Sequence, residues 1–329
     1  MSDEPLVSTD LKHPEVASLD SRLSDSVLLH SSPPPVLSRP TVTVVVCTRF
    51  RPDALRCCLE AIGRLNPPAD DVLVIDNSEG DPETERVARD AGVRYQVEPG
   101  AGLSRARNRG LAESTTEIIA FMDDDGMPCA DWLEHLLPPF DDPAVAAVSG
   151  DIIPPGTPRN TERRQATRYL SSKDLKWFEI ATFGGLGRGS NVALRKSVCS
   201  VWKGFDVRLG RGAPLRIAEE NHAYAVLLSL GYRAAYVPSA LVIHPTKSKN
   251  IEQDAISWIA YWLLLFFEFP GHRLEIAQFL SRRLQGKPLT WPRNPQKPGA
   301  IITSSWRVRL KAAFAGTLLY FRSLKLRGK

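Results

Sequence analysis

Three consecutive aspartates follow an apolar run in the stretch EIIAFMDDDGMP, which extends from Glu117 to Pro128. Side chains alternate in an extended chain, so Asp123 and Asp125 should point one way and Asp124 the other. Neighbouring carboxylates repel each other, and each is costly to desolvate. A divalent cation such as Mg²⁺ or Mn²⁺ would offset this repulsion, because these ions favour oxygen ligands. The alternative is a solvated acidic turn, since Asp and Gly are common turn residues.

The elements that must position these aspartates are predicted from the apolar runs. The β-branched stretch Thr41–Thr48 is apolar on both faces, which is typical of a central parallel strand. Further strands are expected at 71–78, 93–98 and 117–122, with helices beginning near Pro52, Pro82 and Gly102. This alternation predicts a doubly wound α/β sheet, whose ligands bind beyond the carboxyl ends of the strands. Thr48, Asp76 and the three aspartates should share that rim.

Composition places the chain among ordinary globular proteins. Its 329 residues are 43% hydrophobic, enough for a sizeable core. The five cysteines are an odd number without a CxxC pair, so neither a disulfide framework nor a zinc knuckle is indicated. The N-terminus has no basic region followed by an apolar one, so no secretory signal is predicted and a cytoplasmic location is expected.

Charge and composition divide the chain into three parts. Residues 1–40 are rich in Ser, Pro and Asp and are expected to be disordered. A catalytic α/β domain is expected at 41–247, followed by a helical, basic extension at 248–329. The net charge is +5 overall but +12 from Gly271 to Lys329, which leaves −7 for residues 1–270. This asymmetry indicates an anionic partner for the extension.

Seven stretches resemble, in order and spacing, successive motifs of the inverting family 2 glycosyltransferases with the GT-A fold. They are TVTVVVCTRFRPDALRCCLEAI, VLVIDNSEG, GLSRARNRGL, IIAFMDDDGMPCADWLEHLL, GRGSNVALRKSV, GFDVRLGRGAP and AEENHAYAVLLSLGYRAAYVPSALVIH. The resemblance extends from about Thr41 to Pro245, nearly two-thirds of the chain. It implies a Rossmann-like mixed sheet flanked by helices.

The resemblance also implies which residues hold the nucleotide. Those expected at the base are Thr48, Arg49 and Asp76. A carboxylate can accept a hydrogen bond from a base N–H, although an aspartate is also common in turns and helix caps. Arg105 and Asn108 are expected near the base or the diphosphate. On the same helix, Arg107 and Arg109 are interpreted as solvated.

By the same resemblance, the aspartate triplet is the metal and ribose motif. Asp125 would ligate a cation that bridges the diphosphate, Asp123 would face the ribose or the water shell of the metal, and Asp124 would contact the sugar. His244 ends the stretch ALVIH, where a histidine completes the metal site in several relatives. A lone histidine after a strand is otherwise more often structural. The expected cofactor is Mn²⁺ or Mg²⁺.

The general base is expected at the start of a helix. Ala218, Glu219 and Glu220 stand where the family has Gly-Glu-Asp, whose last acid is the base. Glu220 is therefore the expected base, with Glu219 second, because a glutamate can still take a hydroxyl proton across one more methylene. The alternative is that these acids only stabilise a helix N-terminus.

A glycine-rich stretch, 184–191, is expected to line the donor sugar and the acceptor. Its predicted binding residues are Gly189 and Asn191. It lacks the Gly-Lys-Ser/Thr ending of a P-loop. Residues 155–183, which include Trp177 and Phe178, are expected to shape the acceptor site.

The resemblance implies a metal-dependent, inverting transfer of a sugar from a UDP-, GDP- or dTDP-sugar to a hydroxyl. The acceptor is expected to be a glycan, a glycolipid or another hydroxyl compound of cell-envelope or polysaccharide biosynthesis. Two alternatives stay open. The altered Glu219–Glu220 motif could belong to a non-catalytic nucleotide-sugar-binding protein. The Asp-Asp-Asp-Gly sequence superficially matches Mg-dependent phosphatases, although those motifs normally end the first strand.

The extension is expected to contact a membrane without crossing it. The stretch Ala255–Pro270 is apolar but shorter than the roughly 20 residues that span a bilayer, so a buried helix is predicted. The final stretch places aromatic side chains among basic ones, which suits a helix on anionic lipid at the inner face of the cell membrane. Nucleic acid is not the expected partner, because no recognised nucleic-acid module accompanies the charge.

Overall fold

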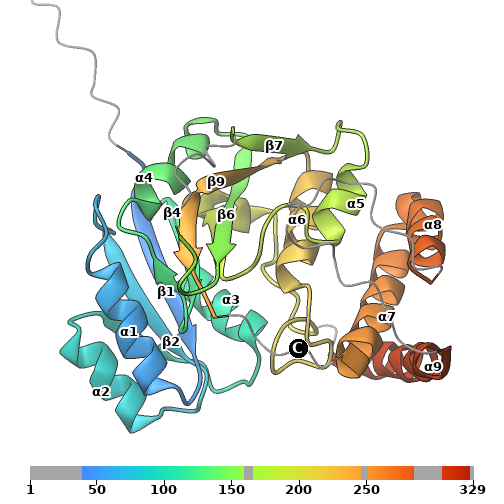
Figure 1. The fold of residues 1–329 in the computed structure, drawn as a ribbon, viewed down its shortest axis with the longest axis horizontal. Coiled ribbons are helices and arrows are strands. Elements are labelled where there is room, and N and C mark those ends of the chain that lie inside the picture. Colours follow the sequence, from blue (N-terminus) through green and yellow to red (C-terminus); the bar gives the residue numbers. More distant parts are fainter. Residues whose placement is uncertain (1–38, 159–165, 246–250, 285–305, 327–329) are drawn as a thin grey trace, which may run out of the picture. The chain divides into compact units, whose positions relative to one another are not determined.

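A mixed nine-stranded β-sheet forms the centre of the protein in a computed structural model, which describes residues 39–158, 166–245, 251–284 and 306–326 (Figure 1). Residues 39–329 belong to one unit. The N-terminal segment that the sequence predicts to be disordered lies, up to residue 38, outside the described residues. The predicted division of the chain at residue 247 stays a prediction.

The first half of the sheet is parallel. Its strands, in spatial order, are β3 (Arg94–Val97), β2 (Asp71–Asp76), β1 (Val42–Thr48) and β4 (Ile118–Asp123). Every residue of β1 is buried, as its apolar character on both faces predicts. Thr48 pairs with Asp76, and Cys47 pairs with Asp123. This register brings the carboxyl ends of three strands level at one rim of the sheet.

Helices connect these strands and cover both faces of the sheet. They are α1 (Pro52–Ile62), α2 (Pro82–Asp90) and α3 (Leu103–Glu113). Leu55 of α1 and Val87 of α2 pack on one face, together with the short α4 (Trp132–Leu136). Ala106 and Leu111 of α3 pack on the other. The predicted doubly wound arrangement is confirmed.

The second half of the sheet is mixed. Its strands are β5 (Met127–Pro128), β6 (Val145–Ile153), β7 (Arg168–Ser171), β8 (Asn191–Arg195) and β9 (Arg233–Ile243). Strand β8 lies antiparallel between β4 and β6, and β9 runs parallel to β6. Strands β5 and β7 pair antiparallel with β9. The end of β9 thereby reaches the same region as the end of β4.

The remaining helices lie on the face covered by α3. They are α5 (Trp177–Thr182), α6 (Glu219–Ser229), α7 (Ile251–Glu268), α8 (Arg273–Leu284) and α9 (Trp306–Ser323). Short 3₁₀ helices occur at Pro138–Asp141, Lys196–Ser200, Pro270–His272 and Leu324–Leu326. Tyr261, Leu264 and Leu265 of α7 are fully buried, which confirms the predicted buried helix. Among the described residues, no helix has the length and apolar character needed to cross a membrane.

Candidate active site

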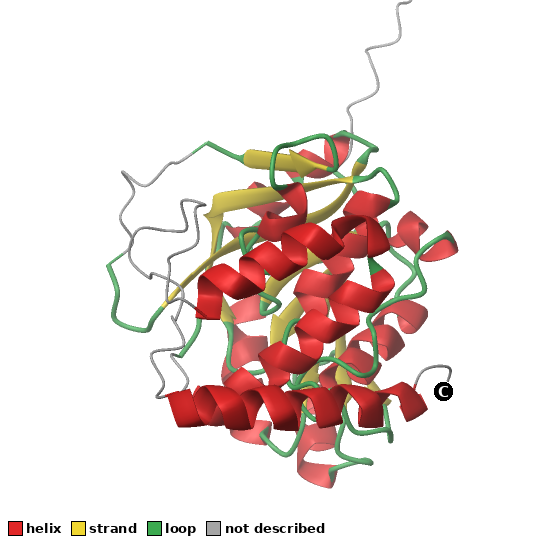
Figure 2. Cartoon of the chain, turned by 90° about the vertical axis from the view of Figure 1, so that its right-hand side faces the viewer, coloured by secondary structure: helices red, strands yellow, loops and turns green. Residues whose placement is uncertain are grey.

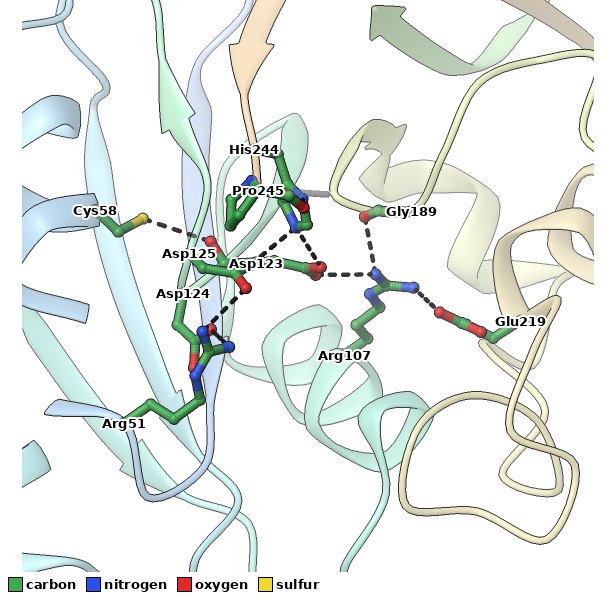
Figure 3. A network of polar contacts seen from close by, with 10 residues as sticks. All are labelled: Arg51, Cys58, Arg107, Asp123, Asp124, Asp125, Gly189, Glu219, His244 and Pro245. Carbon is green, nitrogen blue, oxygen red and sulfur yellow. Dashed lines mark hydrogen bonds and ion pairs between the residues drawn. The ribbon is translucent and has the colours of Figure 1, made fainter. Parts of the chain in front are cut away.

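The aspartate triplet lies where β4 ends and a tight turn begins. The Gly126 backbone N–H donates to the carbonyl of Asp123 at 2.9 Å and closes this turn. The Cys58 thiol of α1 approaches the same carbonyl at 3.6 Å. Asp123 and Asp125 turn toward His244, whereas Asp124 turns toward Arg51 (Figure 3). The opposite orientations agree with the alternation that an extended chain predicts.

Asp123, Asp125 and His244 form a candidate metal centre. One potential ligand atom of each residue lies within 4.8 Å of the others. His244 Nε2 is 2.8 Å from Asp125 Oδ1 and 3.4 Å from Asp123 Oδ2. The His244 backbone N–H donates to the Ile153 carbonyl at 3.0 Å, which fixes the residue beyond the end of β9. Two carboxylates and one imidazole form a donor set that fits Mn²⁺ or Mg²⁺.

The charge of the two carboxylates changes the ionisation of His244. Burial lowers its pKa, but hydrogen bonds and charge interactions with Asp123 and Asp125 outweigh this effect and raise the pKa to about 9. Without a cation, the imidazolium therefore balances the acids. A metal would have to displace that proton, because histidine binds metals in its neutral form.

Asp124 belongs to a separate contact. It is 5% exposed and accepts from the Thr48 hydroxyl at 2.9 Å. Arg51 bridges Asp124 at 2.5 Å and Asp125 at 2.9 Å. Burial raises the pKa of Asp124 to about 6, although Arg51 opposes this shift. Asp124 thus orients Thr48 and Arg51, and Arg51 links it to the candidate metal centre.

Arg107 of α3 is a buried cation at the centre of the site. Its side chain is 2% exposed, so its interpretation as a solvated residue is wrong. The guanidinium contacts Glu219 Oε1 at 3.0 Å and Asp123 Oδ1 at 3.7 Å, and it donates to the Gly189 carbonyl at 2.8 Å (Figure 3). It therefore connects Asp123 of the candidate metal centre with the glycine-rich stretch and with the start of α6.

Helix α6 begins with the two candidate base residues. Ala218 precedes them with φ = 68°, a left-handed conformation that explains why the family prefers glycine there. Glu219 is 7% exposed and paired with Arg107. Glu220 is partly exposed, and burial of its carboxyl and the charge of Glu219 raise its pKa. The two acids therefore differ: Glu219 forms an ion pair with Arg107, whereas the pKa of Glu220 is raised.

A cavity of about 220 Å³ opens next to the triplet. Its lining residues are Cys47, Thr48, Arg49, Arg51, Asn77, Gly102, Leu103, Ala106, Asp123, Asp124, Arg211 and Gly212. Four predicted nucleotide-binding residues are among them: Thr48, Arg49, Asp123 and Asp124. Arg51, Asn77 and Arg211 were not singled out from the sequence. Arg51 and Asn77 each lie near a strand end, which is the signal that could have identified them.

Other predicted binding residues have structural partners. Asp76 is fully buried and accepts from the backbone N–H groups of Ser78 at 2.9 Å and Asp81 at 2.8 Å, and from the Tyr95 hydroxyl at 2.7 Å. Arg105 is half-buried and is not among the residues that line this cavity. Their predicted contacts with the nucleotide stay predictions.

Two predicted asparagines hold the scaffold together. Asn108 exchanges hydrogen bonds of 2.8 and 2.7 Å with the backbone of Phe205. Asn191 is fully buried, donates to two backbone carbonyls at 2.9 Å, and accepts from the Trp132 indole at 2.9 Å. Phe178, expected near the acceptor, is 1% exposed and stacks on His272. These contacts make the three residues supports of neighbouring elements.

Comparison with known sequences points to one family. Residues 43–202 match the model of Glycosyl transferase family 2. The chain is 29% identical over 240 residues to the pre-mycofactocin glycosyltransferase of Mycobacterium tuberculosis, covering 71% of this chain and 48% of the relative. It is 24% identical over 241 residues to the glucosyl-dolichyl phosphate glucuronosyltransferase of Haloferax volcanii, covering 67% and 74%. The chain thus spans about half the length of the first of these curated relatives.

Solved structures share the fold. The mannosyltransferase PcManGT from Pyrobaculum calidifontis, in complex with GDP-Man and Mn²⁺, matches with a TM-score of 0.51 at 18% identity, covering 88% of this chain and 74% of its own. TarS of S. aureus matches with a TM-score of 0.51 at 15% identity, covering 75% and 44%. At these identities the likeness concerns architecture, and the predicted GT-A fold is confirmed.

Proposed function

Because the chain belongs to glycosyl transferase family 2, we propose that it transfers a sugar from a nucleotide-sugar donor to an acceptor hydroxyl with inversion of the anomeric configuration. The observation that carries this proposal is the arrangement around Arg107. This guanidinium contacts both Asp123 of the candidate metal centre and Glu219, the neighbour of the candidate base. Family membership leaves the phosphatase alternative without support.

We place the donor nucleotide in the cavity next to the aspartate triplet as part of this proposal. Arg49, Arg51 and Arg211 line it and provide positive charge for a diphosphate. The proposed donor is a UDP-, GDP- or dTDP-sugar. The GDP-Man complex of PcManGT supports a nucleotide sugar as the class of donor. Asn77 fixes the wall of the cavity, since it donates to the carbonyls of Glu98 at 2.8 Å and Gly100 at 2.7 Å.

Asp123, Asp125 and His244 would hold Mn²⁺ or Mg²⁺. A bound cation would supply electrostatic stabilisation of the charge that develops on the departing nucleoside diphosphate. Arg51 and Arg107 contact the same carboxylates and hold them in place. The Mn²⁺ in the PcManGT complex supports a divalent ion.

The reaction proceeds as a single displacement. The acceptor oxygen forms a bond to the anomeric carbon while the bond from that carbon to the diphosphate breaks. Glu220 takes the acceptor hydroxyl proton. Its raised pKa makes it a stronger base than an ordinary glutamate. Glu219 stays paired with Arg107 and keeps the guanidinium neutralised.

We place the acceptor next to the glycine-rich stretch. A second cavity, of about 450 Å³, lies there between β7 and α5. Its walls include Tyr169, Leu175, Leu186 and Tyr236, which are apolar or aromatic, and Arg168 and Asp174 add charges of opposite sign. Such a lining suits a glycan or glycolipid acceptor of cell-envelope or polysaccharide biosynthesis. Attachment to the inner face of the cell membrane is part of this proposal.

A donor screen tests the proposed function. The purified chain is incubated with a panel of nucleotide sugars and Mn²⁺, and release of the nucleoside diphosphate is measured. We expect slow release from one donor, abolished by EDTA and by Asp125→Ala. Asp53→Ala is the matched control, because its side chain is 93% exposed on α1. Nucleotide-sugar binding without any release would support a non-catalytic binding protein, and equal release by Asp125→Ala would contradict the metal assignment.

A further inference from the structure

Helix α9 packs on α7 through its smallest side chains. Ala312, Gly316 and Ser323 are buried on this side together with the ring of Tyr320. A Cβ atom on Gly316 would lie 2.6 Å from Cβ of Ile259, so the two helices approach closely at this point. In Figure 2, α9 is the long helix that runs across the lower front toward the C-terminus. Leu319 of α9 and Leu324, just after it, also pack against the core.

Three further large apolar residues lie on the opposite side of α9. Phe314 is 78% exposed, Leu318 42% and Phe321 56%. Their spacing of four and three residues places them in one stripe along the helix. Phe267 of α7 is 50% exposed and stacks on Tyr320, which extends the apolar surface onto the neighbouring helix.

Basic side chains accompany the stripe. Lys311, Arg322 and Lys325 are exposed on the same helix and the short 3₁₀ turn that follows it. The sequence from 306 to 326 contains five basic residues and no acidic residue. An isologous contact between two copies would bring this positive surface against itself, which is unfavourable. The charge is complementary to an anionic surface instead.

We propose that the outer face of α9 binds flat on an anionic lipid membrane. This face consists of Lys311, Phe314, Leu318, Phe321, Arg322 and Lys325. Aromatic and aliphatic side chains would enter the boundary between headgroups and acyl chains, while the basic ones contact lipid phosphates. The face shares no residue with the candidate active site, so the inference deepens the proposed membrane location and can be tested without a donor or an acceptor.

Vesicle co-sedimentation of the full chain tests this surface. We expect binding to vesicles of phosphatidylcholine with phosphatidylglycerol, much weaker binding to phosphatidylcholine alone, and loss at 1 M salt, where the Debye length is about 3 Å. Replacing Phe314, Leu318 and Phe321 by serine should weaken binding at least about tenfold. Arg322→Gln with Lys325→Gln should weaken it about 25-fold, or about fivefold per charge.

Two controls separate this surface from general charge and hydrophobicity. Leu274→Ser removes an apolar side chain that is 72% exposed on α8. Arg64→Gln with Arg89→Gln removes two exposed charges, one from the turn after α1 and one from α2. Both controls should bind as the unchanged chain does. The proposal would be overturned by equal binding to neutral vesicles or by unchanged binding of the serine variant. It would also be overturned if the face variants abolished self-association or nucleic-acid binding but left lipid binding unchanged.

Discussion

At the scale of single residues, the proposed function gives the two glutamates of α6 different tasks, because Glu219 is paired with Arg107. Glu220→Gln keeps the size of the side chain and removes its ability to accept a proton. We expect transfer to fall by at least about a hundredfold while donor binding, measured by calorimetry, is unchanged. Glu219→Gln should instead lower the thermal midpoint, because it leaves the charge of Arg107 less compensated. A larger loss of turnover in a stable Glu219→Gln protein would assign the base to Glu219.

The raised pKa of Glu220 gives a second residue-scale prediction. A base must be ionised to act, so the rate should increase as the pH rises through its pKa. Because burial and Glu219 raise that pKa, the acidic limb of kcat/KM should lie at higher pH than for an ordinary glutamate. The measurement is a pH profile of donor-saturated transfer. An acidic limb near pH 4, the range of an unperturbed glutamate, would contradict the assignment.

Sequence patterns predicted the site residues that stand at the ends of apolar strands and missed those whose direction depends on how a helix packs. The aspartate triplet stands at the end of an apolar strand, so its place at the rim follows from local periodicity, whereas His244 was expected in the site from the family resemblance. Arg107 lies in a helix with several polar residues, and the sequence does not show which of them faces inward. The available signal was the pair of small residues on the same helix, Ala106 and Gly110, which indicate the side that packs closely on the sheet. In the structure, a Cβ on Gly110 would lie 2.6 Å from the side chain of Val45.

At the scale of elements, the same distinction separates the two halves of the sheet. Strands β1, β2, β3 and β4 and the helices between them were predicted in order, because each is encoded by a local run. The pairing of β8 between β4 and β6 joins residues more than 40 positions apart, such as Ala193 and Val148. Such pairings depend on long-range packing, so periodicity alone does not predict them.

Helix α7 braces the helix that carries the proposed base. Its last residue, Glu268, contacts His222 of α6 at 2.9 Å and Arg208 at 2.5 Å. Although burial raises its pKa, the hydrogen bonds and charges of these two partners lower it to about 2. The guanidinium of Arg208 occupies the group formed by Asp206, His222 and Glu268, so this group is an ion-pair network rather than a metal site.

Glu268→Gln should therefore destabilise the protein. We expect a loss of about 2 kcal/mol at neutral pH, the usual value of a hydrogen bond to a charged group. Because the folded pKa is depressed, this stabilisation is present above the ordinary pKa of glutamate and disappears as the pH falls toward 2. Urea denaturation from pH 7 to pH 3 measures the effect, with Glu134→Gln, at an exposed position of α4, as the control. A constant difference between the two variants across this range would contradict the network.

At the scale of the whole molecule, the candidate metal centre joins segments far apart in the chain. Asp123 is the last residue of β4, Asp125 lies two residues beyond it, and His244 follows β9 more than 100 residues later. A cation held by all three binds the folded state and not the unfolded chain. It should therefore add stability, by about 2.7 kcal/mol at a concentration about 100 times its Kd. This prediction concerns folding and needs no substrate.

Thermal unfolding with Mn²⁺ and with EDTA measures this effect. We expect the midpoint to rise by several degrees with Mn²⁺ in the unchanged chain and in Asp53→Ala, and not in Asp125→Ala or His244→Ala. The pH dependence has a definite sign, because the metal must displace the proton that Asp123 and Asp125 hold on His244, whose pKa is about 9 without metal. The shift caused by Mn²⁺ should therefore increase from pH 6 to pH 8. If it is the same at both pH values while His244→Ala retains it, then His244 does not ligate the cation and Asp123 and Asp125 bind it alone.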